Sequence, residues 1–100
     1  MFEVDNNGAR KNVRITVDRL DILDSTNLLQ SMQKEIDSAE KSVVLDMSEL
    51  EFMDSAVLGV FVRLNEIAKR SEKEIIFSHL TSFVKNLFRH SRMDSIFKIE

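Results

Sequence analysis

Short apolar runs alternate with longer segments of helical periodicity along this chain, and this alternation constrains the fold more than any other feature. Residues 42–47 and 74–78 are rich in apolar and β-branched side chains with almost no polar alternation, which is typical of strands inside a sheet. Apolar residues recur every three or four positions over residues 25–40, again from residue 55 and again from residue 82, which indicates three amphipathic helices. We therefore expect an α/β fold with helices packed on a sheet.

The two ends of the chain add strands to this sheet. Residues 5–8 end in Asn-Gly, a turn-forming pair, and lie between two apolar alternations, which predicts an antiparallel hairpin. Residues 96–99 have the apolar pattern of one more short strand. We expect a single layer of mixed sheet that opens with the hairpin. The hairpin side chains expected to face inward are Phe2, Val4, Val13, Ile15 and Val17.

Each predicted helix begins at a residue that can cap it and carries one apolar face. Asp, Ser and Thr side chains accept hydrogen bonds from the free amides of a first helical turn. The candidate caps are Asp24 or Ser25, Asp54 or Ser55, and Thr81 or Ser82. The helix side chains expected to face inward are Leu28, Leu29, Met32, Ile36, Ala39, Val57, Val60, Phe61, Leu64, Ile67, Ala68, Phe83, Val84, Leu87 and Phe88. We expect one domain, residues 1–100.

Length and composition exclude several classes of function. At 100 residues, 43% of them hydrophobic, the chain has the size of one compact domain, and we expect its function to lie on the surface. The formal net charge is −3 and the basic residues form no run, so we expect no direct contact with nucleic acid. The longest mostly apolar run, residues 56–62, is far shorter than the roughly 20 residues that cross a bilayer, so we expect no membrane insertion.

The chain also lacks residues that metal and cofactor chemistry commonly use. It has no cysteine, which fits a reducing cytosol, and we expect a cytoplasmic protein. His79 and His90 are eleven residues apart on different predicted elements, so we expect no metal centre. The two glycines, Gly8 and Gly59, do not form a glycine-rich nucleotide loop. We therefore expect no cofactor, no catalytic residue and no enzymatic activity.

Asp54 and Ser55 stand where a loop meets the start of the second predicted helix. A hydroxyl there lies in the positive field of free helix amides, which would stabilise a phosphate of about −1.5 to −2 charges. Ser55 is therefore a candidate phosphate acceptor. The simpler interpretation is that Asp54 or Ser55 only caps the helix, with a contribution of about 1 kcal/mol, and the local sequence alone favours it. A Ser-His-Asp hydrolase site is not expected, because no Gly-x-Ser-x-Gly sequence surrounds Ser55.

The segment around Ser55 resembles the STAS domain of bacterial anti-sigma factor antagonists. That family has an apolar strand ending in Asp-Leu-Ser, followed by an aromatic residue, Ile or Met, Asp-Ser, one variable residue and Gly-Leu-Gly. Residues 45–48 (Leu-Asp-Met-Ser), 52–55 (Phe-Met-Asp-Ser) and 58–59 (Leu-Gly) match this pattern. Residues 19–21 resemble the loop before the family's first helix, and residues 93–99 resemble its closing segment. The resemblance spans nearly the whole chain and implies a STAS-like α/β fold.

The resemblance implies a regulatory protein that acts by binding. In the family, the serine that matches Ser55 is phosphorylated by an anti-sigma factor that is itself a serine protein kinase, and a serine phosphatase removes the phosphate. The unphosphorylated antagonist binds the kinase and frees the sigma factor, a cycle called partner switching. Asp21 matches a carboxylate of the family's first loop and is either a binding residue or a turn residue. The partner-binding residues that the resemblance implies are Asp21, Asp54, Ser55, Ala56, Val57 and Leu58.

Two residues depart from the family pattern. Val57 replaces the first glycine of Gly-Leu-Gly, and we expect its β-branched side chain to add bulk where a kinase approaches Ser55. Asp18 replaces the glycine before the first loop, and we expect a change in turn geometry or in charge there. An alternative function stays open: a STAS accessory subunit of a membrane transport or stress-signalling complex, which would dock on an ATPase through the same helix face without phosphorylation.

Overall fold

Five strands form one mixed sheet, and two further short strands form a separate pair. The computed structural model describes the backbone of residues 1–100 and every side chain except that of Asn7. The larger sheet has the order β1-β2-β4-β6-β7, and β3 pairs with β5. In chain order, the elements are β1 (Phe2–Asn7), β2 (Arg10–Ile15), β3 (Arg19–Leu20), the 3-10 turn η1 (Ile22–Asp24), α1 (Ser25–Ser38), β4 (Ser42–Asp46), β5 (Phe52–Met53), α2 (Ser55–Arg70), β6 (Glu74–Ser78), α3 (Ser82–His90), the 3-10 turn η2 (Met93–Ser95) and β7 (Lys98–Ile99).

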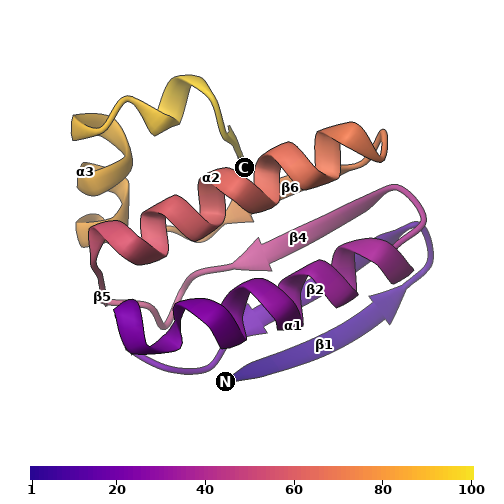
Figure 1. The fold of residues 1–100 in the computed structure, drawn as a ribbon, viewed down its shortest axis with the longest axis horizontal. Helices are drawn as coiled ribbons and strands as arrows, with labels where there is room; N and C mark the ends of the chain where they lie inside the picture. Colours follow the sequence, from indigo (N-terminus) through magenta and orange to yellow (C-terminus); the bar gives the residue numbers. More distant parts are fainter.

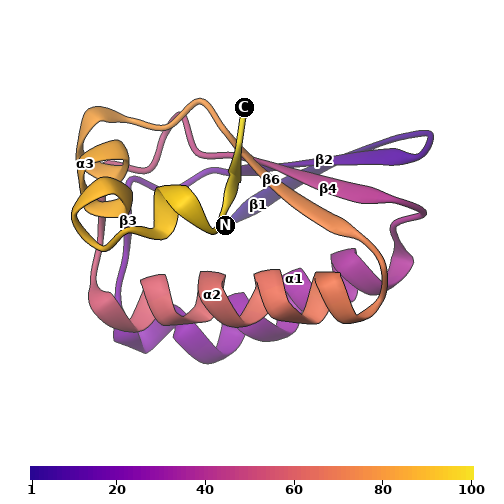
Figure 2. The same cartoon turned by 90° about the horizontal axis from the view of Figure 1, so that it is seen from above.

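The sheet combines one antiparallel pair with parallel strands. β1 pairs antiparallel with β2, whereas β2, β4, β6 and β7 run parallel to one another in that order. α1 and α2 lie side by side on one face of this sheet (Figure 2). α3 lies at the end of the molecule where β5 leads into α2 (Figure 1). The expected α/β fold, with an opening hairpin, one layer of mixed sheet and packed helices, is confirmed.

The hairpin turn comes later and is shorter than the sequence predicts. β1 continues to Asn7, which pairs with Arg10, so that the turn consists of Gly8 and Ala9 rather than residues 5–8. Gly8 has a φ of +72°, in the left-handed region that glycine adopts without strain. Glycine is therefore the residue that this turn requires.

Other boundaries differ from the expectations by a few residues. α1 ends at Ser38 instead of residue 40, because Ala39 has an extended backbone with φ −75° and ψ 147°. The last strand consists of Lys98–Ile99 only. β3 and β5 are not predicted at all, since a strand of two residues carries no recognisable periodicity.

Two side chains that were expected to face inward are exposed. Val4 is 46% exposed because it lies on β1, which is an edge strand with a partner on one side only. Phe83 is 41% exposed, and its ring packs on that of Phe52 with 5.4 Å between centroids instead of entering the core. The helical stripe of α3 therefore predicts the burial of Val84 and Phe88 correctly but not that of Phe83.

Phe77 on β6 lies at the centre of the core. Its buried ring is 5.6 Å from that of Phe61 on α2, 5.5 Å from Phe88 on α3 and 4.6 Å from Phe97, measured between centroids. The first two pairs are edge-to-face, an arrangement that aromatic rings favour. These contacts fix α2 and α3 relative to the sheet.

A buried ion pair joins β2 to α1. Lys11 shares the helix-covered face of β2 with Val13 and Ile15, because alternate residues of a strand point to the same side. Its Nζ donates to Glu35 Oε1 at 3.1 Å and also to Ser38 Oγ. Since a buried ammonium group is costly without hydrogen-bond partners, these contacts hold the last turns of α1 against the sheet.

We predict that Phe77→Ala lowers the free energy of unfolding by about 3–5 kcal/mol, because it removes a buried ring that contacts three others. The matched control is Phe83→Ala, which loses one half-exposed aromatic contact and should cost about 1 kcal/mol. Urea denaturation followed by circular dichroism measures both values. Equal losses for the two variants would contradict the assignment of Phe77 to the centre of the core.

Candidate functional site

Asp54 holds the start of α2 to the turn that precedes α1. As the N-cap residue of α2, it accepts a hydrogen bond at Oδ1 from the Val57 amide at 3.1 Å. Its Oδ2 accepts a second hydrogen bond from the Ile22 amide at 2.9 Å, although Ile22 is 32 residues earlier in the chain. One carboxylate therefore connects two distant segments and fixes the position of η1 relative to Ser55.

Ser55 is the first residue of α2, and its side chain is exposed. Of the two candidate caps, Asp54 takes the cap position, so that the Ser55 hydroxyl is not needed for it. This hydroxyl stands at the positive end of a 16-residue helix. A group attached there would meet solvent, or a protein that binds this surface, rather than the core.

Asp21 shapes the turn η1 next to α2. Its Oδ1 accepts a hydrogen bond from the Leu23 amide at 2.9 Å, while Asp24 Oδ2 accepts one from the Asp21 amide, also at 2.9 Å. This reciprocal pair is a capping box, so Asp21 has the turn role that was one of its two expected roles. The hydrogen bond from Ile22 to Asp54 places Asp21 close to the start of α2, as expected.

Val57 points into the core rather than toward a partner. Its side chain has no exposed surface, and it packs among the buried residues under α2. The expectation that Val57 adds bulk where a kinase approaches Ser55 is therefore wrong, because this face of the helix turns away from solvent. Its neighbours Ala56 and Leu58 are half-buried and keep part of their surface available.

Asp18, which replaces a family glycine, causes no strain in its turn. Its backbone is not in the left-handed region, so the turn does not need a glycine at this position. Its carbonyl oxygen accepts hydrogen bonds from the amides of Glu51 and Phe52 at 2.8 and 3.1 Å. The exposed carboxylate of Asp18 adds one negative charge to this surface, in line with the expected change in charge.

Ile22 and Leu23 on η1 are exposed apolar residues that the sequence pattern does not mark as functional. They are 64% and 89% exposed. The signal that could have found them is their position: they lie between Asp21 and Ser25, ahead of the buried stripe of α1 that starts at Leu28. Apolar residues outside a helical stripe contribute little to the core.

A second partly apolar group lies at the same end of the molecule. Phe52 pairs with Arg19 across β5 and β3, and the Arg19 guanidinium carbon lies 4.4 Å from the centroid of the Phe52 ring. This distance is that of a cation–π contact. Together with Phe83, these side chains cover the junction between the small sheet and α3.

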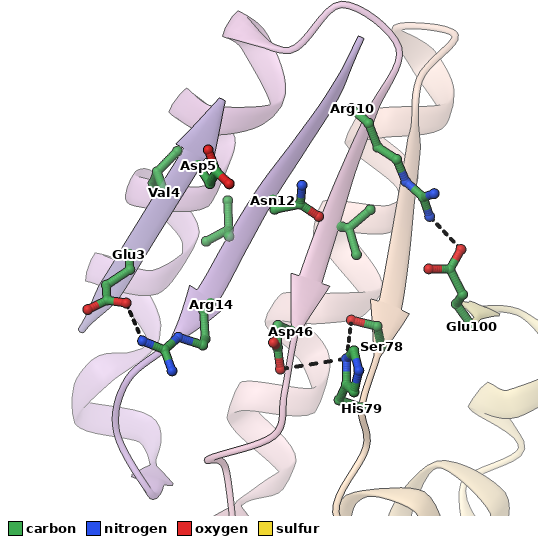
Figure 3. Close-up of a pocket in the computed structure, with 12 residues that line it drawn as sticks. Glu3, Val4, Asp5, Arg10, Asn12, Arg14, Asp46, Ser78, His79 and Glu100 are labelled. Atoms are coloured by element: carbon green, nitrogen blue, oxygen red, sulfur yellow. Dashed lines mark hydrogen bonds and ion pairs between the residues drawn. The ribbon is translucent and has the colours of Figure 1, made fainter. Parts of the chain in front are cut away.

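A groove of about 740 Å³ lies on the sheet face away from α1 and α2 (Figure 3). His79 Nδ1 is 3.2 Å from Ser78 Oγ and 3.9 Å from Asp46 Oδ1. Ser78 is buried and its hydroxyl donates to the Leu45 carbonyl at 3.5 Å, so it is not presented as a nucleophile. The ion pairs beside this groove are Arg10–Glu100, Arg14–Glu3 and Arg14–Glu49.

Both arginines beside the groove are paired with glutamates. The hydrogen bond with Glu3, together with the nearby negative charges of Glu3 and Glu49, raises the pKa of Arg14 above its usual value. Among the described side chains, no cluster of three or more His, Cys, Asp or Glu residues could hold a metal ion. No helix in the described chain has both the length and the apolar character to cross a membrane. Because its arginines are paired with glutamates and its serine is buried, the groove is a weaker candidate site than the surface around Ser55.

We predict that Asp54→Ala lowers the free energy of unfolding by about 2 kcal/mol, because it removes the cap of α2 and the link to Ile22 together. Asp54→Asn keeps one carbonyl oxygen and should lose about half as much. Ser55→Ala is the control and should change stability by less than about 0.5 kcal/mol, since exposed residues away from such features contribute little. Chemical denaturation gives all three values, and an equal cost for Ser55→Ala and Asp54→Ala would mean that Ser55 supplies the cap.

Comparison with known proteins identifies relatives for nearly the whole chain. A family model described as "Mlab, STAS domain" matches residues 2–99. The Bordetella bronchiseptica protein BtrV, named as an anti-sigma factor antagonist, is 25% identical in an alignment that covers 87% of this chain and 85% of BtrV.

Solved structures of similar proteins have the same fold. An anti-sigma-factor antagonist (STAS) domain protein from Planctomyces limnophilus matches with a TM-score of 0.86 at 13% identity, over 98% of this chain and 87% of that chain. The anti-sigma factor antagonist SpoIIAA in its unphosphorylated form matches with a TM-score of 0.80 at 16% identity, over 100% and 88% of the two chains. The phosphorylated form of SpoIIAA, from Bacillus, matches with a TM-score of 0.74 at 15% identity, over 100% and 91%. Because the family model covers all but the two terminal residues, this chain belongs to the STAS domain family.

Proposed function

We propose that this protein is an anti-sigma factor antagonist that is switched by phosphorylation of Ser55. In its unphosphorylated form it binds an anti-sigma factor that is also a serine protein kinase, and the sigma factor is released. The main support for this proposal is the geometry at the start of α2. Asp54 caps the helix, so the neighbouring Ser55 is not needed as a cap, and it is exposed. The names of BtrV and SpoIIAA, both anti-sigma factor antagonists, support the same function.

The contact surface consists of residues from two segments that Asp54 joins. Asp21 contributes from the loop before η1, and Ser55, Ala56 and Leu58 contribute from the first turns of α2, where each keeps some exposed surface. Val57 acts indirectly, because its buried side chain sets how α2 lies on the sheet. A rigid surface of this kind loses little conformational entropy when a partner binds.

A phosphate on Ser55 changes this surface from one that a partner can cover to one that must stay hydrated. An exposed hydroxyl is small and finds hydrogen-bond partners easily, whereas a phosphate brings about −1.5 to −2 charges at neutral pH. Burying such a charge without matching positive groups is very costly. A penalty of about 4 kcal/mol is enough for a thousandfold loss of affinity. A serine phosphatase then restores the binding form.

The protein acts by binding, in the cytoplasm, and has no catalytic role of its own. The surface around Ser55 combines a hydroxyl, carboxylates that are hydrogen-bonded to backbone amides, and apolar side chains. A carboxylate that accepts amide hydrogen bonds on both oxygens, as that of Asp54 does, is committed to structure rather than to proton transfer. This arrangement suits recognition by another protein.

We predict that the anti-sigma factor kinase of the source organism, incubated with the purified chain and ATP, adds one phosphate at Ser55. Ser82 is the matched control, since it is also exposed and is also the first residue of a helix, behind the cap Thr81. Mass spectrometry should locate the phosphate on Ser55 and not on Ser82. Phosphorylation should weaken binding to the kinase by about a thousandfold, as measured by calorimetry.

The corresponding variants test the same point by substitution. Ser55→Asp should bind the kinase clearly more weakly than wild type, and Ser82→Asp should bind as wild type does. If Ser55 stays unmodified and Ser55→Asp binds normally, the phosphorylation switch is wrong. Binding to the ATPase of a membrane transport system instead, with Ser55 unmodified, would establish the alternative function of a transport accessory subunit.

A further inference from the structure

The turn η1 presents two apolar side chains to solvent. Ile22 and Leu23 are 64% and 89% exposed, the highest values among the large hydrophobic residues that the structure describes. They are consecutive, and η1 contains no buried residue. An exposed pair of this size contributes little to folding, since burial of apolar surface is what stabilises a fold. Adjacent exposed apolar side chains mark an interaction site more often than scattered single ones do.

Hydrogen bonds hold this pair in place. The Ile22 amide donates to Asp54 Oδ2 at 2.9 Å, and the Leu23 amide donates to Asp21 Oδ1, also at 2.9 Å. Ser25 Oγ donates to the Ile22 carbonyl at 2.7 Å. The backbone of the turn is therefore fixed at both amides and at one carbonyl, so it presents the two side chains in one direction. A preorganised backbone loses less entropy when a partner binds.

The outer face of α2 near Ser55 is open to close approach. Gly59 is one turn after Ser55 on the same side of the helix, and it is exposed with no atom within 4 Å of the position a Cβ would take. Glycine inside a helix lowers its stability relative to alanine. Nothing in the fold requires glycine at this position, whereas a partner that packs against the helix backbone would.

We propose that Ile22 and Leu23 are the apolar anchor by which the anti-sigma factor holds this protein, with Ser55 at the edge of the same contact. This inference rests on the proposed function, and it names the residues that supply the affinity. The occupant is the anti-sigma factor rather than a second copy of this chain, because the anchor is continuous with the Ser55 surface through the Asp54 hydrogen bond. The partner offers an apolar pocket with basic residues at its rim, opposite Asp21 and the carboxylates near it.

This arrangement explains how a phosphate on Ser55 acts on affinity. Apolar side chains strengthen a contact only when water leaves them. A phosphate beside the anchor keeps its own hydration shell, and the partner then cannot close over Ile22 and Leu23. Phosphorylation therefore removes the contribution of the anchor in addition to its own desolvation cost.

The experiment compares three substitutions of exposed residues by serine. Leu23→Ser and Ile22→Ser each remove one anchor side chain, and Ile96→Ser is the matched control. Ile96 is 49% exposed. It lines a groove together with Asn65 and Lys69, which belong to the second half of α2, so this groove is away from Ser55. Binding is measured by calorimetry with the purified anti-sigma factor of the source organism that binds the wild-type chain. Thermal unfolding and the molar mass in solution are measured for each variant.

We expect Leu23→Ser and Ile22→Ser each to weaken binding by at least about tenfold, because each removes buried apolar area from the contact. Ile96→Ser should bind as wild type does, and thermal midpoints should be nearly unchanged for Ile22→Ser and Leu23→Ser, because neither side chain is part of the core. If both anchor variants bind normally while Ser55→Asp binds weakly, the proposal that Ile22 and Leu23 are the anchor is wrong. The proposed phosphorylation switch at Ser55 then still stands.

The remaining outcomes separate the two proposals. If Leu23→Ser binds weakly while Ser55→Asp binds normally, the anchor stands and the phosphorylation switch fails. If the wild-type chain is a dimer and Leu23→Ser makes it monomeric, Ile22 and Leu23 contact a second copy of this chain, and the anchor proposal is wrong. If no anti-sigma factor of the source organism binds the wild-type chain, both proposals fail.

Discussion

The two hydrogen bonds that the Asp54 carboxylate accepts are the interaction on which the proposed contact surface depends. One oxygen accepts a hydrogen bond from Val57 and caps α2, and the other accepts one from Ile22 and holds η1 in place. The short β3–β5 pair and the hydrogen bonds to the Asp18 carbonyl also join the loop before α1 to the segment before α2, but Asp54 alone links η1 to the first turn of α2 through its side chain. Because a charged acceptor forms stronger hydrogen bonds than a neutral one, a single residue is enough to make the two segments one rigid unit.

The rest of the fold positions this unit without taking part in it. The aromatic core around Phe77 fixes α2 on the sheet, and the buried pair of Lys11 and Glu35 fixes α1. Both helices start at the same end of the molecule, where the exposed Ser55 lies (Figure 1). The proposed contact surface is therefore small, and its exposed residues contribute little to the core.

The sequence alone predicts the order of the main elements and marks Ser55 as a candidate phosphate acceptor, but it does not predict how the site is built. Long apolar patterns locate β4, β6 and the three helices, because their periodicity extends over many residues. The capping pattern at residues 54–55 leaves open which residue is the cap, and only the geometry assigns it to Asp54. The inward direction of Val57 and the exposure of Ile22 depend on packing between distant segments, which local sequence does not encode.

Hydrogen exchange in the complex with the anti-sigma factor tests the central claim most directly, because it reports which backbone amides the partner covers. The account predicts protection of η1 and of the first two turns of α2, with no change along β1 and β2 beside the groove. Protection of β1 and β2 on binding, with η1 exchanging as in the free protein, would contradict it.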